Sequence, residues 1–195
     1  MNYATIKNCD IANGPGVRVS LFVSGCRHRC PGCFNEEAWD FQYGEPFTQQ
    51  TIDSILRMLQ PSHVKGLTLL GGEPFEPENQ PEIVNLLRQV KAQYPEKSIW
   101  AFSGYLFDKD ILSGRLGSWE ITKEYLSYLD VLVDGPFVMA KKDLTLRFRG
   151  SSNQRLINVP DSLRENKVVL WEDWQGNGRG LDDYDEVRNP YRKEV

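Results

Sequence analysis

Residues 17–33 read VRVSLFVSGCRHRCPGC, an apolar run followed at once by three cysteines within eight positions. The run from Val17 to Val23 predicts a buried β-strand, so the cysteines are expected in a loop at its C-terminal end. Iron–sulfur clusters are ordinarily held by four cysteine thiolates. Three clustered thiolates, from Cys26, Cys30 and Cys33, therefore predict a [4Fe-4S] cluster with one iron open to a small molecule. An open metal position is typical of catalytic sites.

The rest of the chain alternates between strand-like and helix-like segments, which is typical of an α/β fold with a mainly parallel sheet. Further strands are expected at residues 66–70, 98–102 and 131–133. Helices are expected after the N-cap residue Thr48, around Pro81 in a first turn, and over residues 120–129. Ligands bind outside the C-terminal ends of parallel strands, so the loops that follow these strands are expected to share one cleft.

Three further loops at these strand ends carry residues suited to a site. They are Gly71-Gly72-Glu73-Pro74, Ser103-Gly104-Tyr105 and Asp134-Gly135-Pro136-Phe137. A glycine pair after a strand is by itself typical of a tight turn, and Glu73 could equally cap the following helix. Ser103 and Tyr105 could equally complete their strand. Only their expected place beside the cysteine loop favours a binding role.

The same segments together resemble a known family. They are NGPGVR (13–18), FVSGC (22–26), CPGCFN (30–35), GGEP (71–74), WAFSGY (100–105), VLVDG (131–135) and RGSSNQ (149–154). In this order they are similar to the radical S-adenosylmethionine (SAM) enzymes that activate anaerobic ribonucleoside-triphosphate reductase. The resemblance covers residues 1 to about 155.

The resemblance implies a partial, incomplete TIM-like βα barrel of the radical SAM type with a mainly parallel sheet. It also implies an oxidoreductase that reductively cleaves SAM and uses the 5'-deoxyadenosyl radical to generate a glycyl radical on the large subunit of the reductase. The implied cofactors are a [4Fe-4S] cluster and SAM, and the implied electron donor is reduced flavodoxin or a similar low-potential donor. Activation of pyruvate formate-lyase or another glycyl-radical enzyme is the alternative.

The resemblance also assigns residues. Cys26, Cys30 and Cys33 are expected to hold the cluster, and SAM contacts are expected from Gly32, Phe34, Gly71, Gly72, Glu73, Ser103 and Tyr105. Many radical SAM enzymes carry an aromatic residue just before the third cysteine, where this chain has Gly32. Gly32 and Phe34 are therefore expected to offer only main-chain or shape contacts, and a core position for Phe34 is the alternative.

Other interpretations of the polar residues stay open. Cys9 lies in an N-terminal segment expected to be irregular and is interpreted as a structural or unpaired thiol, not as a fourth cluster ligand. His28 could complete a tetrahedral zinc site with the three clustered cysteines, which would make the chain a zinc or electron-transfer module. The arginines near the RGSSNQ segment are either a solvated charged hairpin or a docking surface for the reductase; they are Arg147, Arg149 and Arg155.

Composition narrows the class of protein. The chain has 195 residues, of which 40% are hydrophobic, and a net charge of −4, which argues against nucleic-acid binding. The N-terminus lacks the apolar region of a signal peptide, and no stretch approaches the roughly 20 apolar residues of a membrane helix. Crowded cysteines suit a reducing compartment, so a cytoplasmic location is expected. Residues 1–160 are expected to form the radical SAM activase domain, and residues 161–195 a partly mobile extension.

Overall fold

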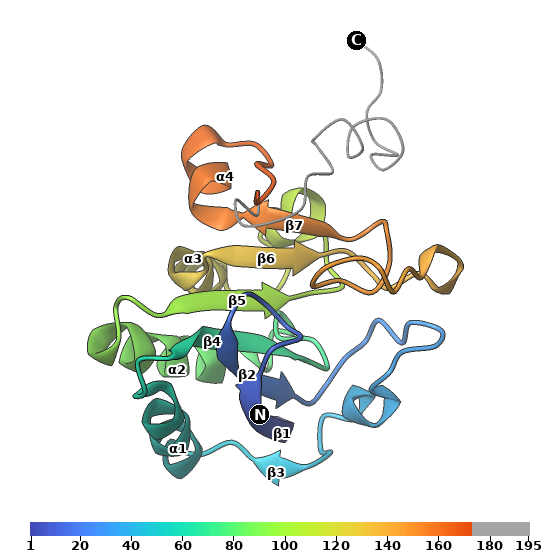
Figure 1. Ribbon diagram of the computed structural model, residues 1–195. Helices are drawn as coiled ribbons and strands as arrows, with labels where there is room; N and C mark the ends of the chain where they lie inside the picture. The colour runs from blue at the N-terminus through green and yellow to red at the C-terminus, as the bar shows by residue number, and fades with distance from the viewer. Residues whose placement is uncertain (173–195) are drawn as a thin grey trace.

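The computed structural model describes residues 1–172, in which helices pack against one continuous β-sheet (Figure 1). The sheet has seven strands within these residues, in the order β3-β1-β2-β4-β5-β6-β7. Their bounds are β1 Asn2–Asp10, β2 Val17–Val23, β3 Glu45–Pro46, β4 Val64–Gly71, β5 Ser98–Phe102, β6 Val131–Asp134 and β7 Arg155–Asn158.

The centre of the sheet is parallel and both of its sides are antiparallel. β2, β4, β5 and β6 pair in parallel, so their C-terminal ends lie along one edge. β1 pairs antiparallel with β2 and with β3, and β7 pairs antiparallel with β6. The cysteine loop begins at the C-terminal edge of the parallel strands, as the sequence predicted.

The predicted partial TIM-like βα barrel with a mainly parallel sheet is wrong. The described strands make three parallel and three antiparallel pairings, and the sheet is open, with β3 and β7 at its two edges. β1 escaped prediction because most of its side chains are exposed or half-buried, which leaves no clear apolar alternation. β7 has only two consecutive apolar residues, Leu156 and Ile157, whereas the equally short β6 has three.

Four α-helices accompany the strands in the described residues: α1 Gln49–Leu59, α2 Gln80–Gln93, α3 Trp119–Tyr128 and α4 Val159–Glu165. Short helical turns also occur at η1 Glu36–Trp39, η2 Phe107–Ile111 and η3 Met139–Lys141. The predicted cap of α1 is confirmed, because the side chains of Thr48 and Thr51 form a reciprocal capping box. Pro81 lies in the first turn of α2, where its missing N–H costs nothing.

The sheet is covered on both faces. α1, α2 and α3 share one apolar core with side chains of the central strands, among them Leu21, Leu67 and Leu69, none of which is exposed. A smaller cluster, built on Trp100, covers the other face together with residues of β6 and β7. β2 and β4 are buried along nearly their whole length, as is typical of central parallel strands in a sheet that is covered on both faces.

The charged side chain of Arg18, near the start of β2, is completely buried. Its guanidinium donates to Thr68 Oγ1 at 2.7 Å, to Leu67 O at 2.8 Å and to Ser98 O at 2.9 Å. It also lies 5.6 Å from the centroid of a Trp100 ring. Burial lowers the pKa of Arg18 to about 10, and Asp130 and Asp10 oppose this shift. These contacts bind β2, β4 and β5 together at their N-terminal edge.

The chain continues beyond the expected boundary at residue 160 without a break in structure. α4 spans that position, and the backbone after it returns to β7, where Asn158 N donates to Val169 O and Trp171 N to Leu156 O. The boundary itself stays a prediction, and most of the expected mobile extension, 173–195, lies outside the described residues. Among the helices of residues 1–172, none has the length and apolar content that a membrane span requires.

Candidate functional site

The cysteine loop leaves β2 and returns along η1. Gly25 N donates to Ala38 O at 2.8 Å and Cys26 N to Trp39 O at 3.2 Å, which joins the start of the loop to η1. Cys33 N donates to Cys30 O at 3.1 Å and closes a turn around Gly32. All three cysteines of the loop are free and half-buried. Their thiols are therefore available to a group bound at the edge of the sheet.

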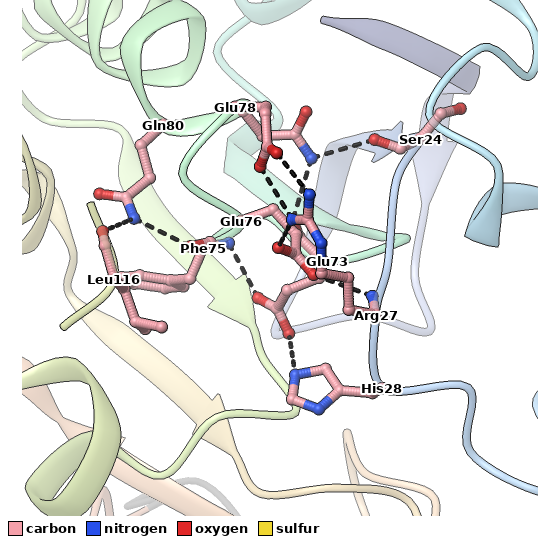
Figure 2. Close-up of polar contacts among 10 residues, drawn as sticks. Ser24, Arg27, His28, Glu73, Phe75, Glu76, Glu78, Gln80 and Leu116 are labelled. Carbon is pink, nitrogen blue, oxygen red and sulfur yellow. Dashed lines mark hydrogen bonds and ion pairs between the residues drawn. The ribbon is translucent and has the colours of Figure 1, made fainter.

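Glu73 joins this loop to the loops that follow β4 and β5. Its side chain is 1% exposed. Oε1 accepts from Phe75 N at 2.8 Å and from Ser103 Oγ at 2.9 Å, and Oε2 accepts from Gly104 N at 2.7 Å. The same Oε2 lies 3.1 Å from His28 Nε2 in the cysteine loop (Figure 2). Glu73 does not cap α2, which begins only at Gln80.

Ser103 and Tyr105 lie where the strand-end rule predicted, beside the cysteine loop. Tyr105 N donates to Ser103 Oγ at 3.0 Å, and the Tyr105 ring packs edge-on against His28 with centroids 4.3 Å apart. Burial, followed by the charges of Glu76 and Glu73, raises the pKa of Tyr105 to about 12. Its hydroxyl therefore stays protonated at neutral pH and can donate a hydrogen bond to a ligand.

Gly71 and Gly72 pack against the base of the cysteine loop. Gly71 has a φ of +112°, and Gly72 N donates to Val23 O at 2.7 Å. A Cβ on Gly72 would lie 2.6 Å from Gly25 O and 2.8 Å from Ala38 O. Glycine is therefore required here by the close approach of two backbone segments, whatever ligand contact these residues also make.

Gly32 and Phe34 lie on the outer side of the loop. Gly32 has a φ of +73°, and a Cβ added there would meet Met139 Cε at 1.9 Å, so the segment after β6 packs directly on it. Phe34 is 82% exposed, which rules out the alternative that it is a core residue. Because Met139 belongs to the loop after β6, the loops that follow all four parallel strands meet around the cysteines, as the sequence predicted.

Two thiols of this loop, those of Cys26 and Cys30, are hard to ionise in the protein alone. Burial raises the pKa of Cys26 to about 12, and the negative charge of Glu73 adds to the shift. Burial also raises the pKa of Cys30, although a backbone hydrogen bond from Phe137 opposes it. A bound metal group favours the thiolate form, so binding at these cysteines would release protons.

The donor set fits an iron–sulfur cluster better than a zinc ion. Nowhere in residues 1–172 do three His, Cys, Asp or Glu side chains already form a group that could hold a metal ion, which favours neither of the two. The zinc alternative requires His28 as a fourth ligand; its Nε2 contacts Glu73, which leaves Nδ1 as the nitrogen that could bind a metal. Three free thiols on one glycine-containing loop suit a larger, thiolate-bound group. The site therefore favours the cluster predicted from the cysteine spacing.

Cys9 lies away from the other cysteines. It is exposed on β1, next to Asp10, which pairs with Arg18 at the N-terminal end of β2. The cysteine loop leaves the opposite end of the same strand. The prediction of an unpaired thiol is confirmed, but the segment is a regular strand and not the irregular one expected.

The sequence interpretation missed the contacts of Arg27 with the acidic residues after β4. Arg27 N donates to Glu76 Oε1 at 2.8 Å, and the guanidinium pairs with Glu76 and Glu78 (Figure 2). The pattern that could have suggested them is the pair of basic residues, Arg27 and His28, between two cysteines, set against three glutamates at 73, 76 and 78.

The arginines expected to dock a partner are engaged inside the molecule. Arg155 Nε donates to Asp134 Oδ1 at 2.9 Å, and its Nη2 pairs with Asp108 at 2.6 Å. Arg149 Nη1 donates to Gln154 O at 2.9 Å. Arg155 therefore holds the end of β6, and replacing it would test the fold before it tested docking.

Comparison with known proteins agrees with this site. The family model of the 4Fe-4S single cluster domain matches residues 12–157. This match covers the cysteine loop and every other strand-end loop of the site, so the chain is of the 4Fe-4S single cluster class.

Its relatives narrow the class. A protein of Enterobacteria phage T4 is 44% identical over 165 residues, which are 84% of this chain and 97% of the relative. One of Escherichia coli K12 is 42% identical over 156 residues (79% and 96%), and one of Vibrio cholerae is 40% identical over 157 residues (79% and 96%). Each is named anaerobic ribonucleoside-triphosphate reductase-activating protein. The chain belongs to the family of these activating proteins.

Proposed function

We propose that this chain is the radical SAM activase that generates a glycyl radical on the large subunit of anaerobic ribonucleoside-triphosphate reductase. The observation that carries the proposal is the loop of three free cysteines at the edge where four strand-end loops meet, in a chain of the activating-protein family. The relatives quoted above are named for this reductase, which favours it over pyruvate formate-lyase as the partner.

Cys26, Cys30 and Cys33 would hold the [4Fe-4S] cluster, which supplies, when bound, the electron that splits SAM into methionine and the 5'-deoxyadenosyl radical. The chain's own contribution is to bind and orient. Three thiolates from one loop leave one iron for SAM. The pKa values of Cys26 and Cys30 are raised in the protein alone, so binding of the metal would have to drive the loss of their protons.

The SAM contacts are proposed from the loops around these cysteines. Gly32 is exposed and Gly71 and Gly72 are half-buried, Tyr105 offers a hydroxyl, and Phe34 offers an exposed ring. Ser103 is proposed to act together with Glu73, because its buried hydroxyl already donates to Glu73 Oε1 and accepts from Tyr105 N. Glu73 has both carboxylate oxygens engaged by protein groups, so we propose that it acts mainly by fixing the loops that touch SAM. A carboxylate bonded in this way is pre-organised and needs no rearrangement when the ligand binds.

The setting follows from the chemistry. The donor is proposed to be reduced flavodoxin or a similar protein, because plant-type iron–sulfur centres have potentials near roughly −400 mV and need a strong reductant. Four free cysteines suit a reducing, cytoplasmic compartment.

The test is anaerobic. Protein reconstituted with iron and sulfide is reduced with dithionite, mixed with SAM, and assayed for 5'-deoxyadenosine beside a Cys30→Ala variant. The activase then has to produce a glycyl radical, detected by electron paramagnetic resonance, when the reductase is added. The proposal is supported if the wild type forms 5'-deoxyadenosine and the Cys30→Ala variant does not. It is contradicted if fully loaded wild type, with the reductase present, forms neither 5'-deoxyadenosine nor a glycyl radical.

A further inference from the structure

Arg27 and Glu76 form an ion pair with an unusual position. The Glu76 side chain is 1% exposed, whereas that of Arg27 is 54% exposed. One carboxylate oxygen of Glu76 accepts from the Arg27 backbone N–H at 2.8 Å, and the other pairs with the Arg27 guanidinium. Arg27 thus satisfies both oxygens of a buried carboxylate, and Arg27 is the residue directly after Cys26.

Glu76 belongs to the segment between β4 and α2, which packing and hydrogen bonds to the protein interior hold in place. Phe75 is fully buried and stacks on Tyr125 with ring centroids 4.4 Å apart. Gln80 Nε2 donates to Phe75 O and to Leu116 O, both at 2.8 Å (Figure 2). A carboxylate on this segment is a fixed point against which a more exposed loop can be positioned.

The same segment holds the other side of Cys26. Asn79 Nδ2 donates to Ser24 O at 3.0 Å and to Glu73 O at 3.0 Å. The guanidinium of Arg27 reaches further, to Glu78 Oε2 at 2.9 Å, and lies 4.6 Å from the centroid of the Phe41 ring. Contacts of Ser24, two residues before Cys26, and of Arg27, directly after it, therefore hold the chain on both sides of Cys26.

Burying a carboxylate costs free energy of desolvation, which well-placed hydrogen-bond donors have to offset. The exposed pair of Arg88 with Glu124, between α2 and α3, shows the usual surface alternative, with side chains 58% and 31% exposed. In the pair of Arg27 and Glu76, the carboxylate is buried and the arginine directly follows the proposed cluster ligand Cys26. This placement points to a role in positioning the cysteine loop, beyond a general contribution to the stability of the fold.

We propose that the pair of Arg27 and Glu76, called the latch below, sets the position of Cys26 before the cluster binds and slows loss of the cluster afterwards. The inference rests on the proposed function, since it takes Cys26 as a cluster ligand. A loop that is already ordered loses less conformational entropy on binding, so the bound group is held more tightly. Arg27 and Glu76 are positioning residues and need not touch the cluster.

The test measures iron release. Reconstituted wild type, Arg27→Met and Glu76→Gln are mixed anaerobically with a ferrous-iron chelator, and the rate of chelate formation is followed by absorbance. Replacing residues that orient metal ligands typically costs roughly 10- to 100-fold in metal affinity, so we expect both variants to release iron about tenfold faster or more. Arg88→Met is the matched control and is expected to release iron at the wild-type rate.

A double variant separates positioning from stability. Arg27→Met leaves the Glu76 charge buried without its partner, which also lowers the free energy of unfolding. Combining Arg27→Met with Glu76→Gln removes that charge, so the melting temperature of the metal-free protein is expected to recover toward the wild type. Iron release is expected to stay fast, because the double variant still lacks the guanidinium that joins the cysteine loop to residue 76. Amide hydrogen exchange at residues 26–30 of the metal-free double variant is expected to be faster than in the wild type.

The outcomes are distinct. Release at the wild-type rate from Arg27→Met overturns the latch, and so does equally fast release from Arg88→Met. Recovery of both melting temperature and iron retention in the double variant also overturns it, since the effect would then come from the unpaired charge alone. Failure of the wild type to hold any cluster overturns the proposed function, and the latch with it.

Discussion

The two ends of β2 each carry an arginine, and the two are used in opposite ways. Arg18, at the N-terminal end, is completely buried and is bonded to a hydroxyl and to backbone carbonyls. Arg27, beyond the C-terminal end, is half-exposed and is bonded to carboxylates. Arg18 connects three strands that are already in place, whereas Arg27 connects a loop to the sheet.

The partners explain the difference. Neutral carbonyl groups can surround a buried guanidinium without adding a second buried charge. Arg18 makes such contacts between β2, β4 and β5, which the sheet already holds in fixed positions. Carboxylates bind an arginine strongly and directionally, which suits a loop that would otherwise be free. One edge of the sheet is thus built for cohesion and the other for placing reactive groups.

The largest expected effect comes from removing the buried cation. Arg18→Met keeps much of the side-chain volume but removes the hydrogen bonds that Arg18 donates to Thr68 Oγ1 and to the carbonyls of Leu67 and Ser98. Each unsatisfied buried group costs about 1–3 kcal/mol, so we expect the free energy of unfolding to fall by about 3 kcal/mol or more. Urea unfolding of the metal-free protein measures this. A loss below about 1 kcal/mol would show that the N-terminal edge does not depend on Arg18.

A smaller loss is expected from Arg155→Met, which tests whether the site edge also relies on a buried charge. Asp134 is fully buried and accepts from Arg155 Nε at 2.9 Å and from Phe107 N at 2.8 Å. Breaking a buried pair costs about 3–5 kcal/mol, but Arg155 is 21% exposed and the Phe107 bond remains, so about 2 kcal/mol is expected. Thermal unfolding of Arg155→Met beside Arg155→Met with Asp134→Asn is the measurement. Equal stability of the two variants would argue against an unpaired charge as the cause.

The smallest effect on stability is expected from Gly32→Ala, in the loop itself. The φ of +73° disfavours alanine by about 1–2 kcal/mol, and the new methyl would overlap Met139 Cε, which lies at the end of a flexible side chain. Iron retention is expected to fall although the fold remains. Adding Met139→Ala relieves the overlap but not the backbone strain, so it is expected to restore retention only in part. Full restoration would show that the overlap alone was responsible. Chelator-induced iron release and the melting temperature together check this.

Local patterns predicted much of this molecule. The spacing of Ile52, Ile55 and Leu59 after Thr48 gave α1, because helix periodicity and capping are read from neighbouring residues. The strand-end rule brought Glu73 and Ser103 to the cysteine loop, because it depends only on the parallel centre of the sheet.

The remaining features depend on contacts that no local pattern encodes. β1 is mostly exposed or half-buried, so its place in the sheet comes from pairing with β2 and not from its own hydrophobicity. The open, mixed sheet follows from β1, β3 and β7 together, and the barrel predicted by resemblance left out all three. The contact of Arg27 with Glu76 spans 49 positions in the sequence, too far for any periodicity to show.

Because Cys9 is exposed and distant from the cysteine loop, a thiol titration can measure how many molecules carry the proposed cluster. The chain has four cysteines, and Cys9 is exposed near the end of β1 that pairs with Arg18, at the opposite end of β2 from the cysteine loop. If the other three thiols are cluster ligands, a thiol-specific dye should modify four groups in the unfolded metal-free protein and one in the folded, loaded protein. The difference between the two titrations reports the fraction of molecules that carry a cluster, and a fluorophore attached to Cys9 would label the activase without touching its reactive edge.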